Sequence, residues 1–177
     1  GDIEIAYHQG RHIRSAAQAA RDADLVLAVV GHTWRDEGER MPFPPKGGDR
    51  KRLTLSPRDE ALILALAEAN PNLVVVLMGG GPIITEAWRS CVPAILMAWY
   101  PGMEGGNALA DLLLGACNPS GRLPCAFPVS EDQLPFFDPS ARGIEYGYYH
   151  GYRLMDHAGF TPAFPFGHGL SYTQFKY

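Results

Sequence analysis

The fold class follows from residues 73–81, which read LVVVLMGGG. An apolar run rich in valine, with no polar alternation, is typical of a strand buried on both faces of a parallel sheet. The three glycines that follow are expected to end the strand in a tight turn. Their spacing matches neither the dinucleotide-binding nor the P-loop glycine pattern, so a nucleotide-binding domain is not favoured.

Similar apolar runs lie on both sides of this one along the chain. Leu25–Val30 ends at Gly31, Ala94–Ala98 is a further strand candidate, and Ile3–Tyr7 is a shorter one. Helical patterns separate the runs, at Ser15–Asp22, Pro57–Ala69, Thr85–Arg89 and Glu104–Leu114. Strands that alternate with helices over short connections pair in parallel. We therefore expect a three-layer α/β sandwich with a mostly parallel sheet and helices on both faces.

Two further segments complete the predicted fold. Arg122–Phe127 contains a proline, so it is expected to be a short strand at a sheet edge. Ser56 is followed by Pro57 and Asp59, which predicts a capped helix start. Residues 32–55 hold several prolines and glycines without periodicity and are expected to form a long loop, which in a compact domain is usually functional.

Composition excludes several classes of function. The 177 residues carry a net charge of −4 and no basic stripe, so nucleic acid is not an expected partner. No apolar run is long enough to span a membrane. The three cysteines lack C-x-x-C spacing and the six histidines lack metal-ligand spacing, so neither metal nor cofactor is expected. The chain opens at Gly1 without a methionine, which predicts a piece of a longer protein.

The loop after the second strand is the candidate site. Residues 31–40 read GHTWRDEGER and place Asp36, Glu37 and Glu39 close to the carboxyl end of that strand. Sites of open α/β sheets lie in such loops. A carboxyl group here could serve as a general acid, with Trp34 stacking on a sugar ring or excluding water. From the residues alone, a solvated acidic loop balanced by its two arginines is an equally open interpretation.

Four segments resemble the C-terminal part of family 3 glycoside hydrolases, which are β-glucosidase-like enzymes. They are residues 93–106 (PAILMAWYPGMEGG), 118–124 (NPSGRLP), 146–153 (YGYYHGYR) and 164–175 (FPFGHGLSYTQF). The resemblance covers nearly the whole chain in the order of the family. It implies an α/β sandwich over residues 1–160, lacking its first strand, and a connection over residues 161–177 into a fibronectin III-like domain.

The resemblance also implies a two-domain active site. In the family, a preceding (β/α)8 barrel carries an aspartate nucleophile, and a loop of the sandwich supplies the glutamate acid/base. Counted from Gly31, that glutamate falls on Glu37, with Glu39 as the alternative. The segment from Gly48 to Arg50, followed by Leu53–Leu55, resembles the continuation of the family loop.

The implied reaction is retaining hydrolysis of terminal β-linked sugars, with an oligosaccharide or β-glucoside as substrate. The isolated chain is expected to be inactive, because the nucleophile would lie in the barrel. The alternative function is a non-catalytic carbohydrate-binding or structural module of the same fold.

Overall fold

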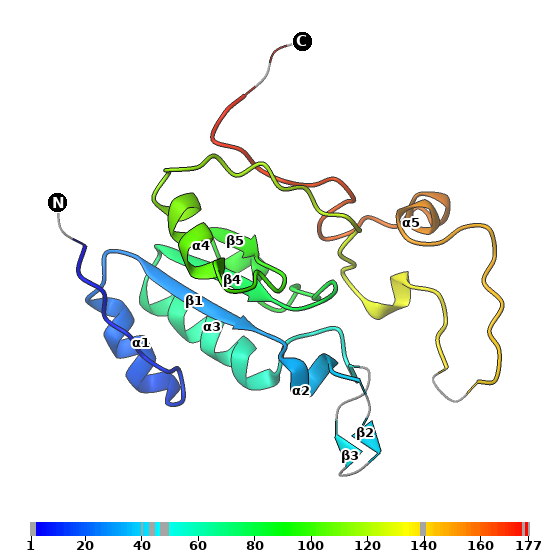
Figure 1. The fold of residues 1–177 in the computed structure, drawn as a ribbon, viewed down its shortest axis with the longest axis horizontal. Helices are drawn as coiled ribbons and strands as arrows, with labels where there is room; N and C mark the ends of the chain where they lie inside the picture. The colour runs from blue at the N-terminus through cyan, green and yellow to red at the C-terminus, as the bar shows by residue number, and fades with distance from the viewer. Residues whose placement is uncertain are drawn as a thin grey trace. The chain divides into compact units, whose positions relative to one another are not determined.

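The structure is a computed structural model that describes residues 3–39, 41–42, 45–46, 50–138, 141–174 and 176. The chain divides into two compact units (Figure 1). The first, here called the sheet unit, comprises Gly1–Arg50, Leu55–Gly79 and Ala87–Trp99. The second unit comprises Lys51–Thr54, Gly80–Glu86 and Tyr100–Tyr177. In the described part of the chain, no helix is both long enough and apolar enough to cross a membrane.

The sheet unit is built on three parallel strands in the order β1-β4-β5. Their bounds are Val26–Gly31 for β1, Leu73–Met78 for β4 and Ala94–Met97 for β5. The predicted α/β fold with a parallel sheet is confirmed. The strands' carboxyl ends lie together, since Gly31 pairs with Met78 and Leu77 pairs with Met97.

Burial along the strands reflects their places in the sheet. In the central strand β4, Leu73, Val75, Val76 and Leu77 are at most 1% exposed, as the continuous apolar run predicts. Buried and exposed side chains alternate along the edge strand β1: Ala28 and Val30 are buried, whereas Leu27 and Val29 are exposed.

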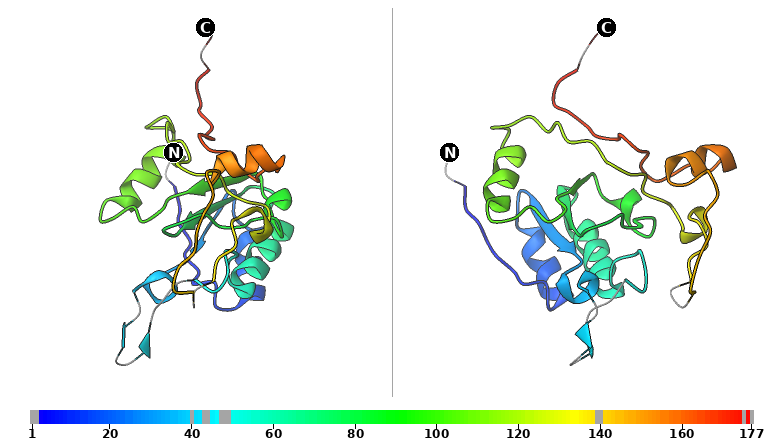
Figure 2. Two further views of the ribbon diagram at one scale, coloured as in Figure 1. Left: turned by 90° about the vertical axis from the view of Figure 1, so that its right-hand side faces the viewer. Right: turned by 45° about the vertical axis from the view of Figure 1, so that its right-hand side comes forward.

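Two helices of the sheet unit pack against each other and lie beside the strands (Figure 2). They are α1, Ile13–Arg21, and α3, Pro57–Ala69. The buried face of α1 consists of the small residues Ala16, Ala17 and Ala20, which permit close approach of the helices. The predicted start of α3 is confirmed, because the Ser56 hydroxyl accepts a hydrogen bond of 3.1 Å from the Asp59 backbone N–H.

Asn70 joins α1, α3 and β4 at one end of the sheet unit. Its side chain is buried, and its Nδ2 donates to the backbone carbonyls of Ala20, at 2.8 Å, and Ala23, at 2.6 Å. Its Oδ1 accepts from the Asn72 backbone N–H at 2.8 Å. One side chain therefore satisfies three backbone groups where a helix ends and a strand begins.

Two α-helices and a 3₁₀ turn form among the described residues of the second unit. They are α4 (Gly105–Leu113), α5 (Tyr152–Ala158) and η2 (Glu131–Gln133). Phe127 is 2% exposed and meets the ring of Phe164 edge-to-face, with 6.2 Å between the centroids. Tyr172 donates its hydroxyl hydrogen to the carbonyl of Leu112 at 2.8 Å. Residues near the C-terminus thus fold within this unit, and the expected link into a following domain stays a prediction.

Four local expectations were wrong. Ile3–Tyr7 forms no strand, because no described residue pairs with it, and Ile3, Ile5 and Tyr7 are exposed. Thr85–Arg89 is not a helix, and only the 3₁₀ turn η1, Arg89–Cys91, forms nearby. Arg122–Phe127 is no continuous strand: it makes one bridge, from Phe127 to Phe164, and Leu123 donates to His168 O and accepts from the Gly167 N–H. Pro124, between these contacts, has no N–H to donate to a ladder.

The fourth concerns the expected loop over residues 32–55. It contains a short helix, α2 (Trp34–Glu37), and a two-stranded ladder of β2 (Met41–Pro42) and β3 (Pro45–Lys46). Elements this short leave little periodicity in a sequence.

Candidate active site

The candidate site begins where β1 ends. Gly31 has a φ of 150°, and a Cβ at this position would collide with the backbone carbonyl of Met78 on β4. Only glycine fits such a close approach of two backbones. The next residue, His32, still donates its backbone N–H to Met78 O at 2.8 Å. The chain therefore leaves the sheet at a fixed point, at the carboxyl end of the strand.

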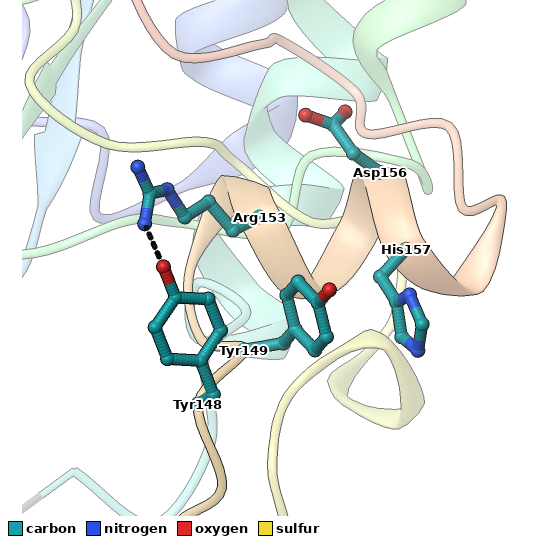
Figure 3. Close-up of a pocket in the computed structure, with 5 residues that line it drawn as sticks. All are labelled: Tyr148, Tyr149, Arg153, Asp156 and His157. Atoms are coloured by element: carbon teal, nitrogen blue, oxygen red, sulfur yellow. Dashed lines mark hydrogen bonds between the residues drawn. The ribbon is translucent and has the colours of Figure 1, made fainter.

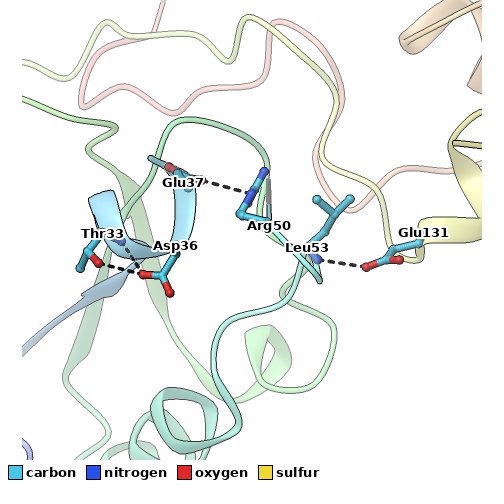
Figure 4. Close-up of polar contacts among 6 residues, drawn as sticks. All are labelled: Thr33, Asp36, Glu37, Arg50, Leu53 and Glu131. Carbon is cyan, nitrogen blue, oxygen red and sulfur yellow. Dashed lines mark hydrogen bonds and ion pairs between the residues drawn. The ribbon is translucent and has the colours of Figure 1, made fainter. Parts of the chain in front are cut away.

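A capping box then starts α2 (Figure 4). The Thr33 backbone N–H and hydroxyl donate to the Asp36 carboxylate at 2.8 and 2.9 Å, and the Thr33 oxygen accepts from the Arg35 N–H at 3.2 Å. The backbone hydrogen bond, followed by that from the hydroxyl, lowers the pKa of Asp36 below its ordinary value. Asp36 therefore holds the helix start rather than offering a free carboxyl group.

Glu37, the predicted acid/base, lies at the other end of α2. Its Oε1 is 3.1 Å from the Nε of Arg50, and both side chains are largely buried, with exposed fractions of 13% and 14% (Figure 4). The structure thus brings together Glu37 and Arg50, a residue of the predicted loop continuation. Gly48 and Asp49 lie outside the described residues.

The other two predicted site residues are exposed. Glu39 is solvent-exposed, and its neighbour Arg40 lies outside the described residues. Trp34 is 64% exposed, and the guanidinium of Arg35 lies 5.4 Å from the centre of its ring. An exposed indole at the mouth of a site offers a flat apolar surface on which a sugar ring could stack.

His32 is a site residue that the sequence interpretation missed. It is 9% exposed, and its Nε2 has no hydrogen-bond partner among the described residues. Burial, followed by the nearby Arg50, lowers the pKa of His32, while Glu37, Asp36 and Asp59 act in the opposite direction. The only sequence signal is its position, directly after the glycine that ends a strand.

Trp99 lies just beyond the carboxyl end of β5. Its φ is 54°, a left-handed conformation that is unusual for so large a side chain. Its carbonyl accepts from the Gly79 N–H, at 3.4 Å, just beyond the end of β4. Strained backbone of this kind clusters at functional sites. Here it lies at the carboxyl ends of the strands, from which the Glu37 loop also departs.

The chemistry available in the described part of this site is that of one carboxyl group. Retaining glycosidases use two, about 5 Å apart, and Asp36, the nearest other carboxylate in sequence, is engaged as a helix cap. Glu37 could donate or accept a proton, and Trp34 could contact a sugar.

The chain matches the family model described as the glycosyl hydrolase family 3 C-terminal domain over residues 3–172. It is similar to a beta-glucosidase of Rhizobium radiobacter, with 44% identity over 175 residues, covering 93% of this chain and 20% of that protein. It is also similar to a probable beta-glucosidase I of Neosartorya fischeri, with 41% identity over 171 residues, covering 93% and 19%. The chain therefore spans about a fifth of the length of these relatives.

Solved structures share the fold. A beta-D-glucoside glucohydrolase from Trichoderma reesei matches with a TM-score of 0.83 and 33% identity, over 92% of this chain and 23% of that chain. A beta-glucosidase from Kluyveromyces marxianus in complex with glucose matches with a TM-score of 0.77 and 32% identity, over 96% and 20%. Since the family model matches nearly the whole sequence, the chain belongs to the C-terminal domain family of the family 3 glycosyl hydrolases.

Proposed function

We propose that this chain is the acid/base-bearing part of a retaining β-glucosidase. The proposal is supported by the beta-glucosidase names of its relatives and by Glu37, a largely buried carboxylate at the carboxyl edge of the sheet. A (β/α)8 barrel of the same protein would supply the aspartate nucleophile, and a fibronectin III-like domain would follow. The substrate would be a β-glucoside or an oligosaccharide with a terminal β-linked sugar.

In the first step, the nucleophile attacks the anomeric carbon while Glu37 protonates the departing oxygen. In the second step, the Glu37 carboxylate takes a proton from the water that attacks the glycosyl-enzyme. The Glu37–Arg50 ion pair, at 3.1 Å, favours Glu37 over Glu39 as the acid/base, because it holds the Glu37 carboxylate in place. Trp34 would contact the sugar next to the scissile bond.

The alternative is a non-catalytic carbohydrate-binding or structural module. One observation favours it, since a largely buried ion pair such as Glu37–Arg50 can be a purely structural element. On this alternative, Glu37 would stabilise the loop and would take no part in proton transfer.

A chimaera tests the proposal. This chain replaces the corresponding stretch of the Rhizobium radiobacter enzyme, to which it is 44% identical, and is compared with Glu37→Gln and Glu39→Gln versions. Proton transfer by a side chain is worth roughly 10²- to 10⁴-fold. We expect Glu37→Gln to lower kcat/KM by that order for cellobiose and far less for 2,4-dinitrophenyl β-glucoside, whose leaving group scarcely needs protonation.

Glu39→Gln should keep activity on both substrates, and the isolated chain should have none. If Glu39→Gln rather than Glu37→Gln lowers kcat/KM for cellobiose, the assignment of the acid/base is wrong by two residues. A folded chimaera that keeps full activity on cellobiose after both substitutions would favour the non-catalytic module.

A further inference from the structure

The second unit contains a pocket that lies outside the Glu37 site. Five residues line it: Tyr148, Tyr149, Arg153, Asp156 and His157 (Figure 3). The last three belong to α5, and the two tyrosines precede this helix in the chain. Its volume of about 410 Å³ lies within the 300–1,000 Å³ typical of small-molecule sites. The pocket is open and shallow rather than enclosed, so it could receive one face of a single sugar ring.

One wall of the pocket is aromatic. The rings of Tyr149 and His157 stack at 4.1 Å with an angle of 8° between their planes. Tyr148 meets Tyr149 edge-to-face at 5.2 Å, and it is 75% exposed. Figure 3 shows the stacked pair side by side, with Tyr148 next to it. Ring contacts of this kind favour the observed arrangement of the three aromatic side chains.

The polar groups of the pocket match a neutral ligand with many hydroxyl groups. Arg153 donates to the Tyr148 hydroxyl at 3.4 Å, and Asp156 adds a carboxylate. The formal charges of Arg153 and Asp156 cancel, so these two side chains together favour neither an anion nor a cation. A carboxylate and a guanidinium can each bond two neighbouring hydroxyls. The apolar C–H face of a pyranose, in turn, suits an aromatic wall.

We propose that this pocket is a second, non-catalytic sugar site that binds a pyranose ring of a β-glucoside. The choice of glucose as the sugar rests on the proposed function, whereas the pocket itself does not. A single ring in an open, shallow site is expected to bind with a Kd on the order of millimolar. In an enzyme, such a site would keep an oligosaccharide near the protein between cleavage events.

The test is a titration of the 177-residue chain with methyl β-D-glucoside and with cellobiose, followed by backbone amide NMR shifts. We expect saturable shifts confined to residues 146–157. Tyr149→Ala should weaken binding by roughly tenfold, because it removes the centre of the aromatic wall. Asp156→Asn is the second variant, since a surface carboxylate can be changed without disturbing the core. It should weaken binding several-fold and leave the spectrum otherwise unchanged.

Two controls separate this proposal from the assignment of Glu37. Tyr146→Ala removes an exposed tyrosine of the same segment that does not line the pocket, and it should leave the affinity unchanged. Glu37→Gln should also leave it unchanged, whatever that variant does to activity in the chimaera. The proposal is overturned if no saturable shifts occur, if the shifts centre on residues 31–37, or if Tyr149→Ala and Asp156→Asn both bind like the wild type. Saturation by an acidic peptide but not by either sugar would overturn it in favour of a protein partner.

Discussion

Replacing Asn70 with alanine should be among the most damaging single changes of a polar residue in the sheet unit. The side chain is 4% exposed and makes three hydrogen bonds to backbone groups, at 2.6 to 2.8 Å. These bonds tie the ends of α1 and α3 to the start of β4. The change would leave the Ala23 carbonyl and the Asn72 N–H without their present partner.

The magnitude follows from the number of bonds. A buried hydrogen bond contributes a net 0.5–1.5 kcal/mol, and more when its partner is left unsatisfied. Three such bonds give about 3 kcal/mol of lost stability for Asn70→Ala. For a chain of this size, that corresponds to a fall in Tm of roughly 6–12 °C. Urea unfolding followed by far-UV circular dichroism measures the free energy directly.

Asn72→Ala is the matched control from the same turn. The Asn72 side chain makes one exposed hydrogen bond, from its Nδ2 to Asp24 O at 3.0 Å, so its removal should cost about 1 kcal/mol or less. If the two variants lose the same stability within experimental error, the assignment of Asn70 as the junction of α1, α3 and β4 is refuted.

Three further changes test the segment that connects β1 to the Glu37 loop. Gly31→Ala should cost roughly 3 kcal/mol or more in urea unfolding, because its Cβ would collide with the Met78 carbonyl. Thr33→Val should cost about 1 kcal/mol by removing the hydroxyl that caps α2 and contacts Asp36, whereas Thr33→Ser should be nearly neutral. His32 has a lowered pKa, so the unfolded chain takes up its proton first as the pH falls through about 6.5. Stability should therefore decline from about pH 7.5 towards 5.5, and His32→Gln should flatten that decline.

The sheet could be read from the sequence because each of its strands is a continuous apolar run. Leu73–Met78 was predicted with its exact bounds, since a strand buried on both faces carries no competing pattern. The expected short strand at Ile3–Tyr7 does not form, because no described strand pairs with it. The β-propensity of a segment is a local property, whereas a strand forms only if a second strand is available to pair with it.

The candidate site could be located but not built from the sequence. The position of a loop after Gly31 follows from the strand pattern, and the choice of Glu37 rests on the family resemblance. Neither predicts that Arg50 pairs with Glu37 or that His32 is buried near them. Such contacts join residues that are distant in sequence, and local patterns do not record them.

The central claim, that Glu37 is the acid/base, is tested most directly by azide rescue of the Glu37→Ala chimaera. Azide attacks the glycosyl-enzyme without needing a general base. With 2,4-dinitrophenyl β-glucoside, the account predicts that added azide raises turnover and yields β-glucosyl azide as the product. The wild-type chimaera and Glu39→Ala should form no more than traces of it. If Glu37→Ala is not rescued and Glu39→Ala is, or if neither variant forms the azide, Glu37 is not the acid/base.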